Sequence, residues 1–440
     1  MSGAAALREA LATPAKAPWL AVHLPAPVRP AARLLALEGG TSFVCSPPGE
    51  LSCATWGVAW QADAAALASF ESLRHAASDV LEHLEERSVV PGAPPPRAFA
   101  ALPFGPRRAG AIALQNGVAL VPRWRYATDD RSAWLTLCLR ADEVASADAL
   151  EDEWRRVGAA LDSEEREGAL PECLRVEAED PARFESSVAL ATEAIRADKL
   201  AKVVLARRTR VELASPPSLQ TVLRRLAEEA GWGASMAVRS EDGAFLAVTP
   251  ERLVRRSGRR VESEALAGTA ELHTAAHELL PASRKDALEH GWVVRDIASL
   301  LAPLCSRLDV PERPGQRVLR HVAHLLTPLA GELRDPVHVL TLAAALHPTP
   351  AVGGVPRQRA LEWIDALEPS PRGLYAGPIG WFDGSGDGDF WVALRGGLVE
   401  GRVATAFAGA GIVRDSQPAE ELRETEVKQR AFLRAVGALR

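Results

Sequence analysis

Two stretches of this chain place carboxylates at helical spacing. Near the middle, Glu289 lies in the charged start of an apolar, helix-like run, "SRKDALEHGW" (283–292). Near the end, Glu421, Glu424 and Lys428 follow one another at steps of three and four residues, so all three project from one helix face. Two such helices could meet at Mg²⁺, which takes one or two carboxylates and keeps water or substrate oxygens for the rest. Spacing alone equally allows two solvated, salt-bridged faces.

Lysine is rare in this chain. Only five of its 51 basic residues are lysines, namely Lys16, Lys199, Lys202, Lys285 and Lys428. A chain that uses Arg for its surface charge has little need of Lys for the same purpose, and Lys, unlike Arg, can lose its proton when it is desolvated. The lysines are therefore candidates for chemistry, with chance retention as the alternative for each.

Composition limits the classes of protein that fit. The chain has 440 residues, of which 47% are hydrophobic and 25% are charged, as in ordinary globular proteins. Its formal net charge of −6 disfavours a nucleic-acid binder, which needs a basic face. The start of the chain lacks the pattern of a signal peptide, and no stretch approaches the ~18 apolar residues of a membrane span. Five scattered cysteines indicate free thiols in a reducing cytoplasm.

Hydrophobic periodicity becomes clear from about residue 180. Apolar spacing predicts helices over 180–198, 283–304 and 416–436. Between them, runs rich in Val and Leu separated by short turn signals predict strands that connect as antiparallel meanders, such as 233–266. Antiparallel runs separated by long helices favour an α+β fold over a doubly wound parallel sheet.

Two apparent metal motifs are weak. "DGSGDGD" from Asp383 resembles a calcium loop, but Leu394 stands where the twelfth-position Glu belongs, so a hairpin turn is expected. His273 and His277 stand four residues apart without the other ligands of a zinc site, which is typical of a polar helix face.

Read together, nine segments resemble the chorismate-utilising enzymes, and isochorismate synthase is the branch to which they are most similar. They follow the family's order and spacing over roughly 180–435. The segments are "KVVLARR" (202–208), "FLAVTPERLV" (245–254), "EALAGTA" (264–270), "SRKDALEH" (283–290), "LHPTPAVGG" (346–354), "RGLYAGPIGW" (372–381), "GDFWVALR" (388–395), "ATAFAGAGIV" (404–413) and "ELRETEVK" (421–428).

The resemblance implies one large α+β domain of packed antiparallel β-sheets, with helices outside and the active site in a cleft. Residues 1–175 would be the variable N-terminal part of this fold, and residues 176–440 the catalytic region that binds chorismate. The implied reaction is the Mg²⁺-dependent, reversible isomerisation of chorismate to isochorismate, in which water adds at C2 and the C4 hydroxyl leaves. Such a reaction needs a base on one face of the ring and an acid on the other, with pKa values tuned toward neutrality.

The resemblance assigns the acid, the base and the metal ligands. Lys202 matches the base, and its apolar strand could supply the desolvation that a lysine base requires. Glu251 matches the acid. Glu289 and Glu424 match the Mg²⁺ ligands, with Glu421 acting through a bound water. The neighbouring Lys285 and Asp286 would orient the carboxylate of the first ligand, or Lys285 would be only an ion-pair partner.

Further positions match the family's contacts with chorismate. The donors to the carboxylate on the enolpyruvyl arm would be Tyr375, Arg395 and the backbone at Gly409. The ring carboxylate would meet backbone donors at Gly268 and Thr269 and the charge of Lys428. His347 would shape the ring pocket or be a packed structural histidine.

Single residues distinguish the branches of this family. Aminodeoxychorismate synthases carry a lysine where Ala267 stands, and anthranilate synthases usually carry Gln at the position of Lys202 and recruit a glutaminase. Salicylate synthases tend to carry Thr in place of Ala351, so a salicylate synthase, which goes on to eliminate pyruvate, is the alternative. We expect a cytoplasmic monomer or dimer without nucleic-acid, membrane or glutaminase partners, supplying either menaquinone or a siderophore.

Overall fold

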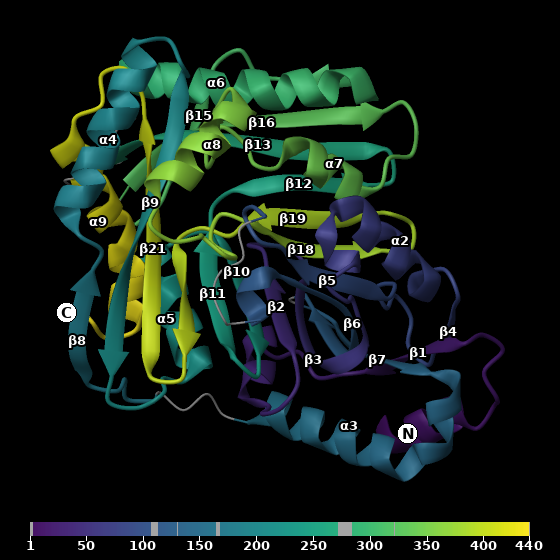
Figure 1. The fold of residues 1–440 in the computed structure, drawn as a ribbon. Coiled ribbons are helices and arrows are strands. Elements are labelled where there is room, and N and C mark those ends of the chain that lie inside the picture. The colour runs from purple at the N-terminus through teal and green to yellow at the C-terminus, as the bar shows by residue number, and fades with distance from the viewer. Residues whose placement is uncertain are drawn as a thin grey trace.

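The computed structural model describes residues 3–106, 113–129, 131–163, 168–271, 284–320 and 322–439, which form an α+β fold (Figure 1). The strands are β1 Trp19–Pro25, β2 Ser42–Ser46, β3 Ser52–Gln61, β4 Leu84–Ser88, β5 Arg97–Ala101, β6 Val118–Thr128, β7 Ala133–Arg140, β8 Cys173–Ala178, β9 Lys202–Leu213, β10 Ala234–Ser240, β11 Gly243–Thr249, β12 Arg252–Ser257, β13 Arg260–Glu271, β14 Cys305–Asp309, β15 Gly315–Val318, β16 Val322–Leu333, β17 Gly354–Val355, β18 Pro378–Asp383, β19 Gly388–Val392, β20 Gly396–Glu400 and β21 Val403–Ile412. The helices are α1 Gly3–Leu11, α2 Phe70–Leu81, α3 Ala147–Asp162, α4 Pro181–Arg196, α5 Leu219–Ala230, α6 Arg284–Leu301, α7 Val339–Leu346, α8 Arg357–Leu367 and α9 Pro418–Ala435.

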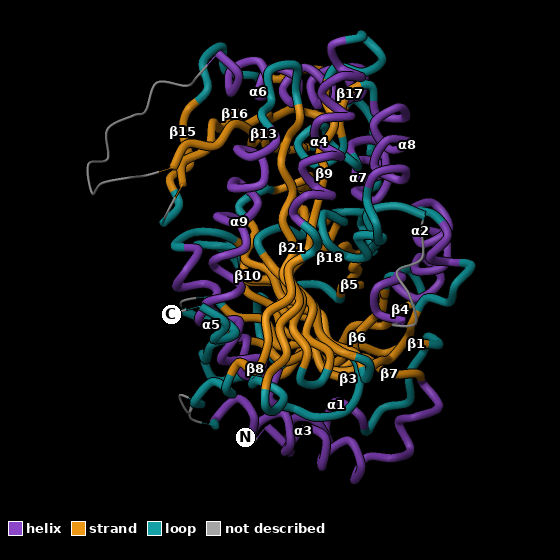
Figure 2. The backbone as a smooth tube through the Cα atoms, turned by 60° about the vertical axis from the view of Figure 1, so that its left-hand side comes forward, coloured by secondary structure: helices purple, strands orange, loops and turns teal. Residues whose placement is uncertain are grey.

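The strands join into one curled sheet. Its neighbouring strands run antiparallel, apart from the parallel pair β1 and β4, among the pairings that the described residues form. Strands from both parts of the chain pair directly, since β2 pairs with β10 and β5 with β18. The antiparallel α+β architecture with helices outside is confirmed (Figure 2), and the expected separate sheets are continuous through hydrogen bonds. Strands of the first 175 residues thus complete the sheet, while the boundary at 175 stays a prediction.

Strand β9 connects the two apolar cores. Val203 and Leu205, in its first half, pack in one core, and Val211 and Leu213, in its second half, pack in the other. β9 pairs along its length with β21, and Val355 of β17 pairs with its first residue, Lys202. The start of β9 is therefore held between two neighbouring strands inside the first core.

The predicted helices and turn are present. Helix α4 begins after Asp180, whose side chain accepts a hydrogen bond from the Ala182 amide, and Pro181 stands in its first turn. Helices α6 and α9 cover the other two predicted ranges, and α9 packs against β21 (Figure 1). The Asp383 carboxylate accepts hydrogen bonds from the amides of Ser385 and Asp387, which confirms a hairpin turn between β18 and β19.

Two smaller expectations also meet the structure, and a third cannot be compared with it. All five cysteines are free thiols. Among the described helices, none combines the length and the apolar composition that a bilayer crossing requires. His273 and His277 lie outside the described residues, as do the side chains of Lys285 and Asp286, so their expected roles stay predictions.

Candidate active site

A cavity lies where β9, β13, β21, α6 and α9 come together. Most of the residues that the sequence nominates line it. Those in its wall are Glu251, Gly268, Glu289, Ala351, Tyr375, Arg395, Gly409, Glu424 and Lys428. The fold thus brings these groups together from eight of the nine quoted segments.

Lys202 does not line the cavity itself, but it is hydrogen-bonded to the wall residue Glu289. Its side chain is completely buried, and its Nζ donates to Glu289 Oε1 at 2.8 Å. The pair fits because Gly411 stands beside it, on the strand that pairs with β9. A Cβ atom at Gly411 would lie 2.5 Å from Glu289 Oε1 and 3.2 Å from Lys202 Cε. The predicted base and a predicted metal ligand are therefore direct partners.

Glu251 is a buried carboxyl in the cavity wall. It lies in the two-residue break between β11 and β12 and is 2% exposed. Burial raises its pKa to about 8, with a further upward contribution from Glu264, while the charges of Lys202 and Lys428 act in the opposite direction. Thr349 Oγ1 lies 3.5 Å from its Oε1. The carboxyl can therefore hold a proton near neutral pH, as a general acid must.

Helix α9 brings a carboxylate and an ammonium to the opposite wall. Glu424 and Lys428 form an ion pair of 2.5 Å, and Lys428 Nζ also donates to the Gly409 carbonyl at 3.0 Å. Glu421 stands one turn earlier on the same helix, completely buried and behind the cavity wall. Both lining residues are thus held in position by the helix spacing that the sequence shows.

The donor set suits Mg²⁺. Glu289 of α6 and Glu424 of α9 offer hard carboxylate oxygens to one cavity. Among the described residues, no three His, Cys, Asp or Glu side chains converge closely enough to hold a metal by themselves. A Mg²⁺ ion here would therefore take its remaining oxygens from water or a ligand, which is its usual habit.

Arg395 is held by a histidine that the sequence did not single out. Arg395 Nη2 donates to His324 Nε2 at 2.8 Å, and His324 Nδ1 donates to the Gly268 carbonyl at 3.0 Å. Burial and the nearby Arg395 lower the pKa of His324 well below its usual value, so its ring is neutral and can accept from the guanidinium. The register of β13 and β16, with a bulge at Gly268 (φ 74°), brings His324 to the Gly268 carbonyl, and Arg395 comes from the connection between β19 and β20. A lone histidine in an apolar strand carries no local signal for this role.

Tyr375 also lines the cavity. Its ring stacks on Phe407 with centroids 5.3 Å apart, and burial raises its pKa to about 12, so it stays a phenol. Beside it, Arg372 donates to both oxygens of buried Glu368 and to the carbonyls of Val204 and Val352. Arg372 lies in the quoted "RGLYAGPIGW" segment but received no role from the sequence, because its partners come from distant segments.

His347 does not line the cavity, and Thr269 adjoins the wall residue Gly268. His347 is outside the cavity wall, where its Nε2 donates to the Phe104 carbonyl at 3.0 Å and its ring packs edge-on against the Phe104 ring. Burial lowers its pKa to about 4, so it is a neutral, packed histidine. The backbone of Thr269 pairs with His324, and its side chain lies outside the described part of the chain.

Residues 20–437 match the family model described as chorismate binding enzyme. Over 261 residues the chain is 38% identical to the isochorismate synthase MenF of Bacillus subtilis, covering 58% of this chain and 55% of that protein. Over 268 residues it is 40% identical to the salicylate biosynthesis isochorismate synthase of Pseudomonas aeruginosa, covering 60% and 56%. The chain thus spans little more than half the length of these two relatives.

Solved structures extend the likeness to the whole fold. The menaquinone-specific isochorismate synthase MenF of Escherichia coli is 25% identical and superposes with a TM-score of 0.83 over 99% of both chains. A 2,3-dihydroxybenzoate-specific isochorismate synthase of Bacillus anthracis, described as putative, is 28% identical with a TM-score of 0.72, over 92% of this chain and 99% of that one. With the family match over nearly its full length, this chain belongs to the chorismate-binding enzymes.

Proposed function

We propose that this chain is a Mg²⁺-dependent isochorismate synthase. The observation that carries the proposal is the pairing of two buried groups at one cavity: Lys202, joined to the wall residue Glu289, and Glu251, whose pKa is raised to about 8. An acid that holds its proton near neutrality, close to a lysine, suits a reaction that removes one hydroxyl and adds another.

In this reaction Lys202 takes a proton from the attacking water as its oxygen bonds to C2, the ring double bonds shift, and Glu251 protonates the hydroxyl that leaves C4. Arg395 donates to a substrate carboxylate, for which its planar fork is suited, while His324 keeps its guanidinium in place. Tyr375, a phenol at neutral pH, adds a further donor at the same wall. These groups orient the ring between base and acid.

Glu289 and Glu424 would hold Mg²⁺, which supplies positive charge opposite the ring carboxylate of chorismate. Without that charge, a substrate carboxylate about 4 Å from one of them would cost on the order of 4 kcal/mol at an effective dielectric constant of about 20. Lys428 and backbone donors near Gly268 would complete this end of the site, with Glu421 reaching the metal through water.

The relatives support the choice of branch. The relatives are named as isochorismate synthases, one of them menaquinone-specific and another 2,3-dihydroxybenzoate-specific. Lys202 stands where anthranilate synthases usually carry Gln, and Ala267, in the cavity wall, replaces the lysine of aminodeoxychorismate synthases. Ala351, also in the wall, favours an isochorismate synthase over a salicylate synthase.

Purified protein incubated with chorismate and Mg²⁺, with products separated by chromatography, tests the proposal. Isochorismate without pyruvate is expected. Pyruvate together with salicylate would identify the alternative, a salicylate synthase. An aromatic amine formed only with ammonia, or no turnover at any Mg²⁺ concentration, would contradict both.

A further inference from the structure

The acid Glu251 lies in a stretch of backbone that the sheet itself does not hold continuously. β11 ends at Thr249 and β12 begins at Arg252, which leaves Pro250 and Glu251 between the strands. One hydrogen bond from the Val392 amide reaches the Glu251 carbonyl at 3.0 Å. The Glu251 amide donates to Thr249 Oγ1 at 3.3 Å. The Pro250 carbonyl and the Arg252 amide, on either side of Glu251, need other partners if the side chain is to keep one position.

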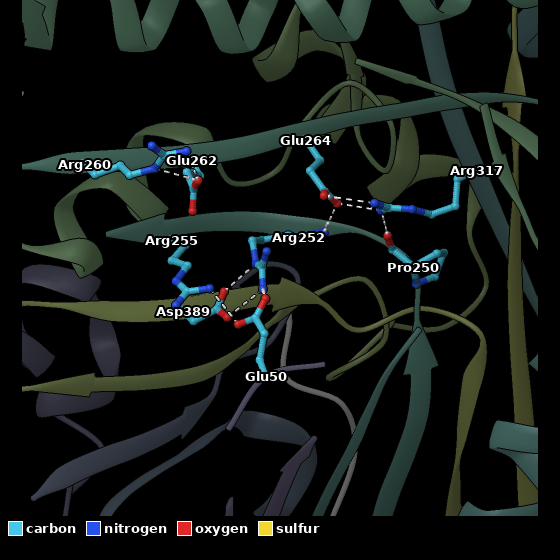
Figure 3. A network of polar contacts seen from close by, with 9 residues as sticks. All are labelled: Glu50, Pro250, Arg252, Arg255, Arg260, Glu262, Glu264, Arg317 and Asp389. Atoms are coloured by element: carbon cyan, nitrogen blue, oxygen red, sulfur yellow. Dashed lines mark hydrogen bonds and ion pairs between the residues drawn. The ribbon is translucent and has the colours of Figure 1, made fainter. Parts of the chain in front are cut away.

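Arg317 of β15 supplies the partner before Glu251 (Figure 3). Its Nη1 donates to the Pro250 carbonyl at 2.5 Å and to Glu264 Oε2 at 2.7 Å, and its Nη2 donates to Glu264 Oε1 at 3.0 Å. The guanidinium also lies 3.9 Å from the ring centroid of Trp232. Both charged side chains are mostly buried, 13% and 15% exposed, so this is a well-held, two-pronged ion pair.

Glu264 of β13 supplies the partner after Glu251. Its Oε2 lies 3.4 Å from the Arg252 amide, so the same ion pair meets the carbonyl before Glu251 and the amide after it. The Arg252 side chain is held separately, by Asp389 at 2.9 Å and Glu50 at 2.6 Å (Figure 3).

We propose that Arg317 and Glu264 are positioning residues for Glu251: they grip the peptide groups on both sides of it and place a balanced pair of charges next to the acid. The inference deepens the proposed function, since it rests on Glu251 being the acid. Neither residue lines the cavity, so neither is expected to touch substrate.

The charges around Glu251 give the pair a second effect. Glu264 faces Glu251 from β13 and raises its pKa, whereas Lys202 from β9 and Lys428 from α9 lower it. Thr349 lies beside the carboxyl, and Glu289 and Glu424 share the same cavity. Removing the Glu264 charge should therefore lower the pKa of Glu251, which a role in strand packing alone would not do.

Two substitutions separate the hydrogen bonds to the backbone beside Glu251 from the effect of the Glu264 charge. Glu264→Gln removes the negative charge and one of the two carboxylate oxygens that accept from Arg317. We therefore expect kcat to fall about tenfold or more with little change in KM. The basic limb of the pH profile should move to lower pH. Arg317→Lys keeps the charge but cannot reach three acceptors at once, so kcat should fall without movement of that limb. Glu262→Gln is the matched control, because Glu262 is on the same strand and forms a more exposed pair with Arg260 (Figure 3).

Titration of the Glu251 carboxyl by infrared difference spectroscopy, assigned with Glu251→Gln, needs no turnover and so stays informative if the proposed function fails. A lower Glu251 pKa in Glu264→Gln than in wild type and Glu262→Gln supports the inference. Wild-type titration and wild-type kcat in Glu264→Gln would overturn it. If circular dichroism shows that Glu264→Gln does not fold, Arg317→Lys decides: kcat equal to that of wild type overturns the inference, and a loss with an unmoved limb supports it.

Discussion

Lys202 Nζ and Glu289 Oε1 lie 2.8 Å apart, across 87 residues of sequence. The hydrogen bond joins the first residue of β9 to helix α6, so the group proposed as base and the group proposed as metal ligand lie side by side. Glu289 also lines the cavity, whereas Lys202 lies behind it.

Lys202→Ala should reduce turnover of chorismate by about 10²–10⁴-fold, the range typical of a lost general base. Binding of chorismate, measured by calorimetry, should change little, because the base acts mainly in the transition state. Lys199→Ala is the control, since Lys199 is exposed and lies three residues earlier. Substantial turnover by Lys202→Ala would show that another group is the base.

The rate should fall as the pH rises through about 8, because Glu251 must be protonated to act as the acid and burial raises its pKa to that value. Glu251→Gln should lose most of the activity and the basic limb with it. A pH–rate profile at saturating chorismate and Mg²⁺ measures both. An unchanged basic limb in a still active Glu251→Gln would assign that limb to another group.

The same carboxyl should make stability depend on pH. Its pKa rises from an ordinary 4.5 to about 8, so between these values the folded chain binds more protons than the unfolded chain, and the free energy of unfolding falls as the pH rises. In Glu251→Gln the free energy of unfolding should fall less steeply with pH. Between pH 4.5 and pH 8 the difference should add up to a few kcal/mol at most. Urea unfolding at pH 5 and pH 8 compares the two proteins. Identical slopes would mean that folding does not raise the pKa of Glu251.

Glu424→Gln should raise the Mg²⁺ concentration needed for half-maximal activity about tenfold or more, because one of the two carboxylate ligands is lost. Glu426→Gln is the matched control, since Glu426 stands two residues later on α9 and points to the surface. Calorimetric Mg²⁺ titration provides a readout apart from activity. Equal Mg²⁺ requirements in the two variants would remove Glu424 from the metal site.

Gly411→Ala should disrupt the pair between Lys202 and Glu289, because its Cβ would lie 2.5 Å from the Glu289 oxygen. We expect the free energy of unfolding to fall by about 1–3 kcal/mol, together with a large loss of turnover. Gly158→Ala in α3 is the control, because its Cβ would meet nothing within 4 Å and Ala favours a helix. A stable, fully active Gly411→Ala would show that the pair can shift without cost.

Local patterns determined much of what this structure contains. Apolar periodicity predicted helices α4, α6 and α9, because such signals act within a few residues along the chain. Most of the residues that the resemblance of nine segments nominated line the cavity, including Glu251, Glu289 and Glu424. The antiparallel character of the sheet also followed from the short turns between strands.

The tertiary structure decided which of these groups are partners. His324 of β16 meets Arg395, which lies between β19 and β20, and Arg317 meets Pro250 across 67 residues. His347, in a segment that carries the resemblance, packs against Phe104 outside the cavity wall instead. Hydrogen bonds and pKa shifts depend on distances of a few ångströms between segments far apart in the chain. Residue types and local spacing do not carry that information, whereas the pairing of strands and the burial it produces do.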